Sequence, residues 1–365
     1  MRRRRHRHGR RHREERAEPI EFVQELIEAG KLDEARRLLD GLEGDEAVLE
    51  SFRGILDMKA GRPERAIAHF ERVLVLKPTQ TAVWLYLGQA RFQTGRFRES
   101  LRALEKGAAV GRKLPAFFQL KARAEKELGL VEAAYGSLEE ARGLFPGQDD
   151  LVREQALLLV GEGLYAAALS KGQEYLARRP EDRDGYLILG EALRKAGRPR
   201  EAAVILEQAA LRFDQDPEIL ARLAFAYSTD HRTLAAARLF AKATRLGGEH
   251  AFAAAEHFRL AGRFREAMQM NARVQDPKKK LSQRLAIYLG SAHFSRAAAL
   301  EGALVSATAL DDTCRYRLAY ANLRTGDLQT AERLAREVED AALKESAGRI
   351  LARIAELRAR QAGTL

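Results

Sequence analysis

The sequence predicts an all-α protein built as a solenoid, that is, a stack of two-helix hairpins. Three observations predict this fold. Small residues recur at a step of 34 positions, apolar residues recur at steps of three and four, and prolines are few, with 9 among 365 residues. No stretch of alternating apolar and polar residues indicates a β-strand. With 46% hydrophobic residues, the chain can fold around a large buried core.

The 34-residue period appears as three columns of small residues. The first column supplies the left-handed turn at which the chain reverses between two helices. The other two columns stand where helix axes cross, because only small side chains let two backbones approach closely. The columns are Gly61, Gly95, Gly129, Gly163 and Gly197; Gly54, Gly88, Ala122, Ala156, Gly190 and Ala224; and Ala66, Ser100, Ala134, Ala168, Ala202 and Ala236. Prolines end the second helix of some units, at Pro78, Pro146 and Pro180.

In chain order, the sequence predicts a disordered basic tail at 1–16, a first hairpin at 19–42, nine repeats and a capping helix at 341–360. One hairpin cannot bury its large side chains alone, whereas a stack of hairpins can. The repeats are expected at 47–80, 81–114, 115–148, 149–182, 183–216, 217–247, 248–277, 278–311 and 312–340.

Four residues depart from the repeat pattern. His231 and Ala292 stand where glycine is expected, Leu285 takes a position for a small residue, and Gly172 takes a position for a large core residue. We therefore expect altered helix packing around the fourth and eighth repeats.

The unit resembles the tetratricopeptide repeat over about nine tenths of the chain. Residues 47–80 carry Gly54, Gly61, Ala66, Phe70 and Pro78 at the marked positions of that family, and the next unit supplies the W-x-x-L-G order with Trp84, Leu87 and Gly88. The resemblance implies a right-handed superhelix that binds other proteins in a concave groove and has no catalytic activity of its own.

The resemblance also implies which residues line that groove, namely positions 2, 5, 9, 12 and 13 of each first helix. A mixture of apolar and charged side chains there suits a bound peptide or helix with apolar anchors. Alternatively, about half of these residues simply pack within the superhelix. The apolar positions are Ile55, Met58, Leu85, Phe92, Leu157, Val160, Leu187, Phe225, Phe252, Tyr316 and Tyr320; the charged positions are Arg123, Lys126, Arg153, Glu191, Arg194, Glu249 and Glu256.

Most of the net charge of +11 belongs to the tail. Residues 1–16 hold nine arginines against Glu14 and Glu15, which gives +7 and leaves +4 for the other residues. Such a segment can hold nucleic acid, an anionic surface or an acidic protein, without sequence preference because it has no aromatic residue for base stacking. It can equally be a tail without function, or the result of a misplaced start codon. The tail arginines include Arg2, Arg3, Arg4, Arg5, Arg7, Arg10, Arg11 and Arg13.

The sequence favours a cytosolic protein. No uncharged stretch reaches the roughly 18 apolar residues that a membrane helix needs, and no apolar segment follows the tail as in a signal peptide. The single cysteine, Cys314, excludes an internal disulfide. Arginine outnumbers lysine, a bias typical of GC-rich bacterial genomes.

No motif for catalysis, a cofactor or a metal is present. His250 and His257 lie about 10 Å apart on a helix, too far to share one ion. The acidic pairs at 45–46, 149–150 and 311–312 are interpreted as helix caps. We therefore expect a scaffold or adaptor that binds a partner peptide or helix. The alternative is a nucleic-acid-associated regulator that uses its arginine-rich tail.

Overall fold

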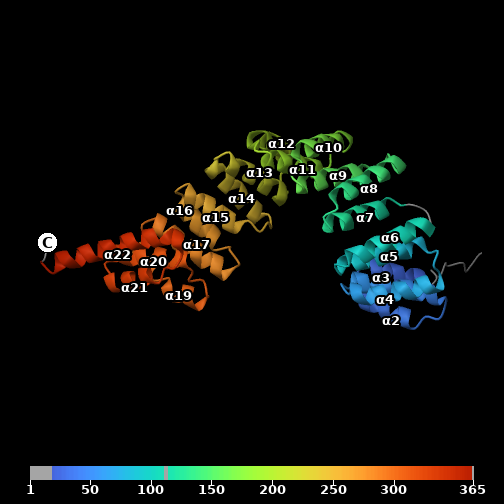
Figure 1. The fold of residues 1–365 in the computed structure, drawn as a ribbon, viewed down its shortest axis with the longest axis horizontal. Helices are drawn as coiled ribbons and strands as arrows, with labels where there is room; N and C mark the ends of the chain where they lie inside the picture. Colours follow the sequence, from blue (N-terminus) through green and yellow to red (C-terminus); the bar gives the residue numbers. More distant parts are fainter. Residues whose placement is uncertain (1–18, 111–113, 364–365) are drawn as a thin grey trace, which may run out of the picture. The chain divides into compact units, whose positions relative to one another are not determined.

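The computed structural model describes residues 19–110 and 114–363, so the basic tail lies outside the described residues. Within these two ranges every regular element is a helix and no strand forms (Figure 1). The chain divides into two compact units, one up to Glu162 and the other from Gly163 onward. In each unit successive hairpins pack against their neighbours, so the fold is the predicted all-α solenoid.

The first unit contains helices α1 to α9. Helices joined by a short turn pack against each other, and the second helix of each pair contacts the first helix of the next. The helices are α1 (Pro19–Glu28), α2 (Leu32–Asp40), α3 (Glu46–Lys59), α4 (Pro63–Leu76), α5 (Thr81–Gln93), α6 (Phe97–Val110), α7 (Pro115–Glu127), α8 (Val131–Leu144) and α9 (Asp149–Gly161).

The second unit contains helices α10 to α22. The same pairing continues as far as α21, and α22 packs against α20 and α21 at the end of the stack. The helices are α10 (Tyr165–Arg178), α11 (Arg183–Lys195), α12 (Pro199–Arg212), α13 (Pro217–Thr229), α14 (Thr233–Arg245), α15 (Ala251–Leu260), α16 (Phe264–Asn271), α17 (Pro277–Gly290), α18 (Phe294–Ala298), α19 (Glu301–Ser306), α20 (Asp312–Thr325), α21 (Leu328–Arg336) and α22 (Ala341–Gln361).

The turn inside each hairpin uses one left-handed residue. The glycines of the first column have φ between 70° and 76°. His231 and Ala292 adopt the same conformation, with φ of 61° and 58°, although neither is glycine. The residue after the turn also bonds in the same way, since the amide of Arg62 donates to Asp57 O and that of Arg232 to Tyr227 O, both at 2.8 Å. The repeat therefore keeps its turn where the glycine is missing.

We expect Ala292→Gly to stabilise the protein by about 0.5–1 kcal/mol. A left-handed residue with a Cβ costs about 1–2 kcal/mol, of which the greater flexibility of glycine in the unfolded chain cancels part. Hydrogen exchange of α17 should slow accordingly. Ala196→Gly is the matched control, because Ala196 lies at the equivalent end of α11 with φ of −72°. That substitution should destabilise its hairpin, and stabilisation by both changes would contradict this account of the turn.

The second column of small residues marks where the two helices of a hairpin cross. A Cβ added to Gly54 would lie 2.5 Å from Cε1 of Phe70, and one added to Gly88 would lie 2.8 Å from Cδ2 of Leu104. In both cases the large side chain comes from the second helix of the same hairpin and is buried. The glycine is therefore required by the close approach of a core side chain.

The fourth and eighth repeats accommodate their departures from the repeat pattern in different ways. At Gly172 the core is filled from the next hairpin, because a Cβ there would lie 2.8 Å from Cδ2 of the buried Leu189. In the eighth repeat the second helix is divided into the short helices α18 and α19. Leu285 and Leu304 are fully buried in one cluster there, so a large residue at the crossing is accommodated by displacing part of the second helix.

Acidic residues at the starts of helices act as caps in two of the three predicted pairs. Asp45 accepts a hydrogen bond from the amide of Ala47 at 3.0 Å, and Asp311 accepts one from the amide of Cys314 at 2.7 Å. Asp149 and Asp150 instead lie in the first turn of α9, where negative charge favours the helix dipole.

Candidate functional site

The residues predicted to line a groove lie on the first helices of their hairpins, from α3 to α20, except Glu249, which lies in the loop before α15 (Ala251–Leu260). None of the sixteen that we regard as the strongest candidates is buried, whereas Val160, also expected there, is buried. Those of the sixteen that belong to one unit are called the first-helix face of that unit. The sixteen residues are Ile55, Met58, Leu85, Phe92, Arg123, Lys126, Arg153, Leu157, Leu187, Glu191, Arg194, Phe225, Phe252, Glu256, Tyr316 and Tyr320.

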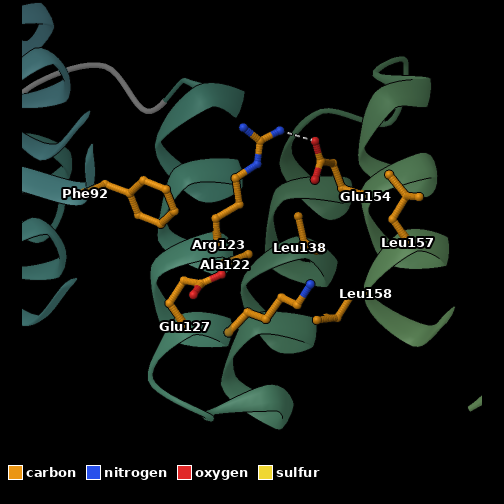
Figure 2. A pocket seen from close by; sticks show the side chains of 9 residues that line it. Phe92, Ala122, Arg123, Glu127, Leu138, Glu154, Leu157 and Leu158 are labelled. Atoms are coloured by element: carbon orange, nitrogen blue, oxygen red, sulfur yellow. Dashed lines mark hydrogen bonds and ion pairs between the residues drawn. The ribbon is translucent and has the colours of Figure 1, made fainter. Parts of the chain in front are cut away.

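In the first unit, four residues of the first-helix face line one pocket of about 290 Å³. Phe92 comes from α5, Arg123 and Lys126 come from α7, and Leu157 comes from α9. Figure 2 shows Phe92 and Leu157 on either side of Arg123. Three successive hairpins thus contribute to a single hollow, which we call the Phe92 pocket.

The apolar surface of the Phe92 pocket is built by residues of two kinds. Ala122, Leu138 and Leu158 are buried and belong to the core beneath the pocket. Leu157 is 46% exposed, and the ring of Phe92 packs edge to face against Phe97 with centroids 5.3 Å apart. Because the core and Phe97 hold these side chains in place, the pocket has a firm apolar floor open to solvent.

Charged side chains border the same pocket. Arg123 forms an ion pair with Glu154, which joins α7 to α9 (Figure 2). Lys126 is exposed and forms no ion pair within the described part of the chain. The pocket therefore offers an apolar floor bordered by the ion pair of Arg123 with Glu154, by Lys126 and by the carboxylate of Glu127.

In the second unit, charged residues of the first-helix face are engaged with neighbours. Glu191 bonds to Arg194 at 2.9 Å and lies 3.4 Å from Arg222. Burial alone would raise the pKa of Glu191, but these cations outweigh it and hold the pKa below the usual range. A hydrogen bond from Arg259 likewise lowers the pKa of Glu256 against the effect of its burial. Both carboxylates are therefore ionised at neutral pH.

The aromatic members of the face in the second unit remain accessible. Phe225 is 40% exposed and packs edge to face against the buried Phe240, with centroids 4.9 Å apart. Tyr320 packs against Phe294 at 5.9 Å and accepts a hydrogen bond from Arg324 at 2.9 Å. Whether any of these side chains binds a partner stays a prediction.

The first unit contains a buried ionic cluster that the sequence analysis does not predict. Glu50 and Asp57, both on α3, are 4% and 1% exposed. Asp57 accepts hydrogen bonds from Arg36 of α2 at 2.5 Å and from Arg62 at 3.0 Å. The contact with Arg36 joins the first hairpin to the second, and the contact with Arg62 lies within the second hairpin.

His69 of α4 lies between the two buried carboxylates. Its Nδ1 is 2.8 Å from Oε2 of Glu50, and its Nε2 is 3.5 Å from Oδ2 of Asp57. One sequence signal could have revealed Glu50, since the residues at steps of 34 from it are large and apolar, namely Trp84, Phe118, Val152, Tyr186 and Leu220. A carboxylate in such a column must be buried with a partner.

His257, one of the two histidines considered for metal binding, has both ring nitrogens in contact with other groups. Nε2 of His257 lies 2.7 Å from the Ser228 hydroxyl, and Nδ1 lies 2.8 Å from Ala253 O. In the described residues, no group of three or more His, Cys, Asp or Glu side chains could hold a metal ion. Across the same residues, no helix combines the length and apolar character that crossing a bilayer requires.

Comparison with known proteins identifies the repeat. Residues 57–124 and 159–227 match the family described as tetratricopeptide repeat. Superkiller protein 3 of Schizosaccharomyces pombe is 30% identical over 115 residues, which cover 29% of this chain and 8% of that protein. The chain thus spans only a small part of that relative.

Three solved structures are similar to parts of the chain. A tetratricopeptide repeat protein from Parabacteroides merdae covers 76% of this chain and 99% of its own, with 16% identity and a TM-score of 0.48. MamA covers 47% of this chain and 94% of its own, with 18% identity and a TM-score of 0.41. YrrB, described as having an unusual peptide-binding site, covers 58% and 99%, with 18% identity and a TM-score of 0.40.

Proposed function

Because this chain is a tetratricopeptide repeat protein, we propose that it is a non-catalytic scaffold or adaptor that holds a segment of another protein on a first-helix face. The observation that carries the proposal is the Phe92 pocket, to which three successive first helices contribute. A pocket of about 290 Å³ accommodates one large apolar side chain of a bound segment.

The physical support for this proposal is the exposure of anchored apolar side chains. Leu157, Phe225 and Phe252 are each at least 40% exposed. Burying such side chains against a partner releases about 25 cal/mol for each Å² of apolar surface removed from water. The ion pairs around them are formed before binding, so their geometry needs no rearrangement. Such a surface favours a helix or peptide with apolar anchors.

A photo-crosslinking amino acid at position 157 tests this function in the cell. We expect it to crosslink reproducibly to one segment of one partner, identified by mass spectrometry. The matched control is position 211 on the second helix α12, where leucine is 87% exposed. Phe92→Ala in the same chain should lower the yield at position 157 by about fivefold or more, as for an interface anchor. Equal yields at positions 157 and 211, or no effect of Phe92→Ala, would contradict the proposal.

The nucleic-acid alternative depends on residues 1–16, with their charge of +7. Removing these residues should weaken binding to a single-stranded RNA and flatten its dependence on salt, because fewer phosphates are neutralised. Equal, weak binding by the full and shortened chains would exclude this alternative. A cytosolic location and a bacterial source stay predictions from the sequence.

A further inference from the structure

We propose that a hollow in the second unit binds an acidic peptide segment with one apolar anchor residue. The hollow has a volume of about 450 Å³ and lies between α15, α17 and the loop before α20. Phe252, Lys278, Lys279 and Ser282 are among its lining residues, and we call it the Phe252 hollow. This inference rests on the proposed function, because it names the chemistry of one bound segment.

The walls of the hollow are fixed by buried polar contacts. The side-chain amide of Gln283, which is 3% exposed, donates to the carbonyl of Phe252 at 2.9 Å and so ties α15 to α17. Asn271 donates in turn to Gln283 at 3.2 Å. The thiol of Cys314 donates to the hydroxyl of Ser282 at 3.5 Å, which ties α20 to α17. The hollow is therefore formed before a ligand arrives.

Phe252 supplies the apolar contact. Its side chain is 43% exposed, and among the described residues its ring packs against no other aromatic ring. An exposed aromatic ring in a preformed hollow is typical of an interface anchor.

Two lysines give the hollow its charge. Lys278 and Lys279 are exposed, and neither side chain forms an ion pair within the described part of the chain. Lys280 is engaged, since its ammonium donates to the carbonyl of Ala272 at 2.8 Å. The helix dipole places partial positive charge at the first turn of α17. The two lysines add to it and make the electrostatic potential of the hollow more positive.

The nearest acidic residues, of which Asp311 itself lines the hollow, form no ion pair with Lys278 or Lys279 within the described residues. Asp276 caps α17 by accepting from the backbone amides of Lys278 at 2.9 Å and Lys279 at 3.2 Å. Asp311 caps α20 through the amide of Cys314. Two exposed ammonium groups that form no ion pair, beside an exposed aromatic ring, are complementary to carboxylates that flank an apolar side chain. A nucleic acid would instead require cations that follow its backbone, which the hollow lacks.

The test uses the full chain and a fluorescein-labelled peptide with one phenylalanine at its centre and three acidic residues on each side. Fluorescence anisotropy should show binding that weakens by about tenfold or more in the double variant Lys278→Glu, Lys279→Glu, because two attractive charges become repulsive. Phe252→Ala should weaken it severalfold. The matched control is Lys242→Glu, Lys344→Glu, which changes the net charge equally at two exposed lysines of the same unit. Its affinity should change by less than about twofold, because exposed charges far from the ligand are screened.

Several results would overturn the inference. The inference is wrong if the acidic peptide does not bind. It is also wrong if a peptide with amides in place of the acids binds equally well, or if the control variant loses as much affinity as the variant Lys278→Glu, Lys279→Glu. Binding of a twelve-nucleotide RNA that depends on Lys278 and Lys279 but not on Phe252, while the peptide stays unaffected, would assign the hollow to nucleic acid instead. If the hollow fails while crosslinking at position 157 still depends on Phe92, only this inference falls. If crosslinking at position 157 does not depend on Phe92, the proposed function itself is wrong.

Discussion

Asp57→Asn should speed hydrogen exchange in α3 and α4 by about 30- to 150-fold, which corresponds to about 2–3 kcal/mol of opening free energy. Asp57 is 1% exposed and receives hydrogen bonds from Arg36 and Arg62. Removing one partner of a buried ion pair usually costs about 3–5 kcal/mol because a charge remains buried alone. Both arginine side chains are about 40% exposed and can turn to water, so we expect a loss smaller than that range, about 2–3 kcal/mol.

The control for Asp57→Asn is Glu43→Gln, which removes the same charge from an exposed loop residue of the same unit. It should change the exchange rates by less than about twofold, since surface substitutions rarely exceed 0.5 kcal/mol. Equal effects of the two substitutions would show that net charge, and not the buried cluster, determines stability here.

The same cluster predicts sensitivity to acid. Burial alone would raise the pKa of Asp57, but Arg36 and Arg62 outweigh it and hold the pKa below its ordinary 3.8. The pKa of Glu50 is likewise below its ordinary 4.5, since bonds from His69 and Arg53 outweigh burial. A lowered folded pKa gives stability that is complete above the ordinary pKa and is lost as the pH falls through the folded value. The difference between wild type and Asp57→Asn should therefore shrink as the pH falls below about 4, as measured by exchange of α3 and α4.

Gly54→Ala should destabilise the second hairpin by up to about 2 kcal/mol, because the added methyl overlaps the ring of Phe70 at a cost of up to about 3 kcal/mol. The nearest ring atom would lie 2.5 Å from the new Cβ, and the ring is fully buried. This steric cost exceeds the roughly 1 kcal/mol by which alanine is favoured over glycine within a helix. Exchange in α3 and α4 should accelerate.

Gly136→Ala is the matched control for Gly54→Ala. Gly136 lies inside α8, and a Cβ added there meets no atom within 4 Å. The same substitution should stabilise α8 by up to about 1 kcal/mol through helix propensity. If both substitutions destabilise, the close approach of Phe70 is not the reason for Gly54.

The fold can be predicted well from the sequence because each repeat carries the same small residues at the same turn and helix-crossing positions. Glycines at one register identify the turns, and the register itself identifies Ala292 as a turn residue. The division of the eighth second helix into α18 and α19 could not be predicted, because it depends on how Leu285 and Leu304 share one core. Local propensity carries no information about that distant packing.

The sequence indicates which residues line the Phe92 pocket but not which ion pairs they form. The resemblance selected Phe92, Arg123, Lys126 and Leu157, and the structure brings these four side chains to one pocket. The partner of Arg123 is Glu154, 31 residues away, and the sequence offers many equivalent acids. Ion pairing depends on side-chain geometry between helices, which no repeat pattern specifies.

The left-handed turns without glycine have a consequence for how such chains are recognised. The match to the family ends at residue 227, just before His231. The backbone nevertheless reverses at His231 and Ala292 as it does at Gly197. A hairpin of this array can therefore form its turn without the marker glycine. Surveys that count hairpins by their glycines will underestimate the length of such arrays.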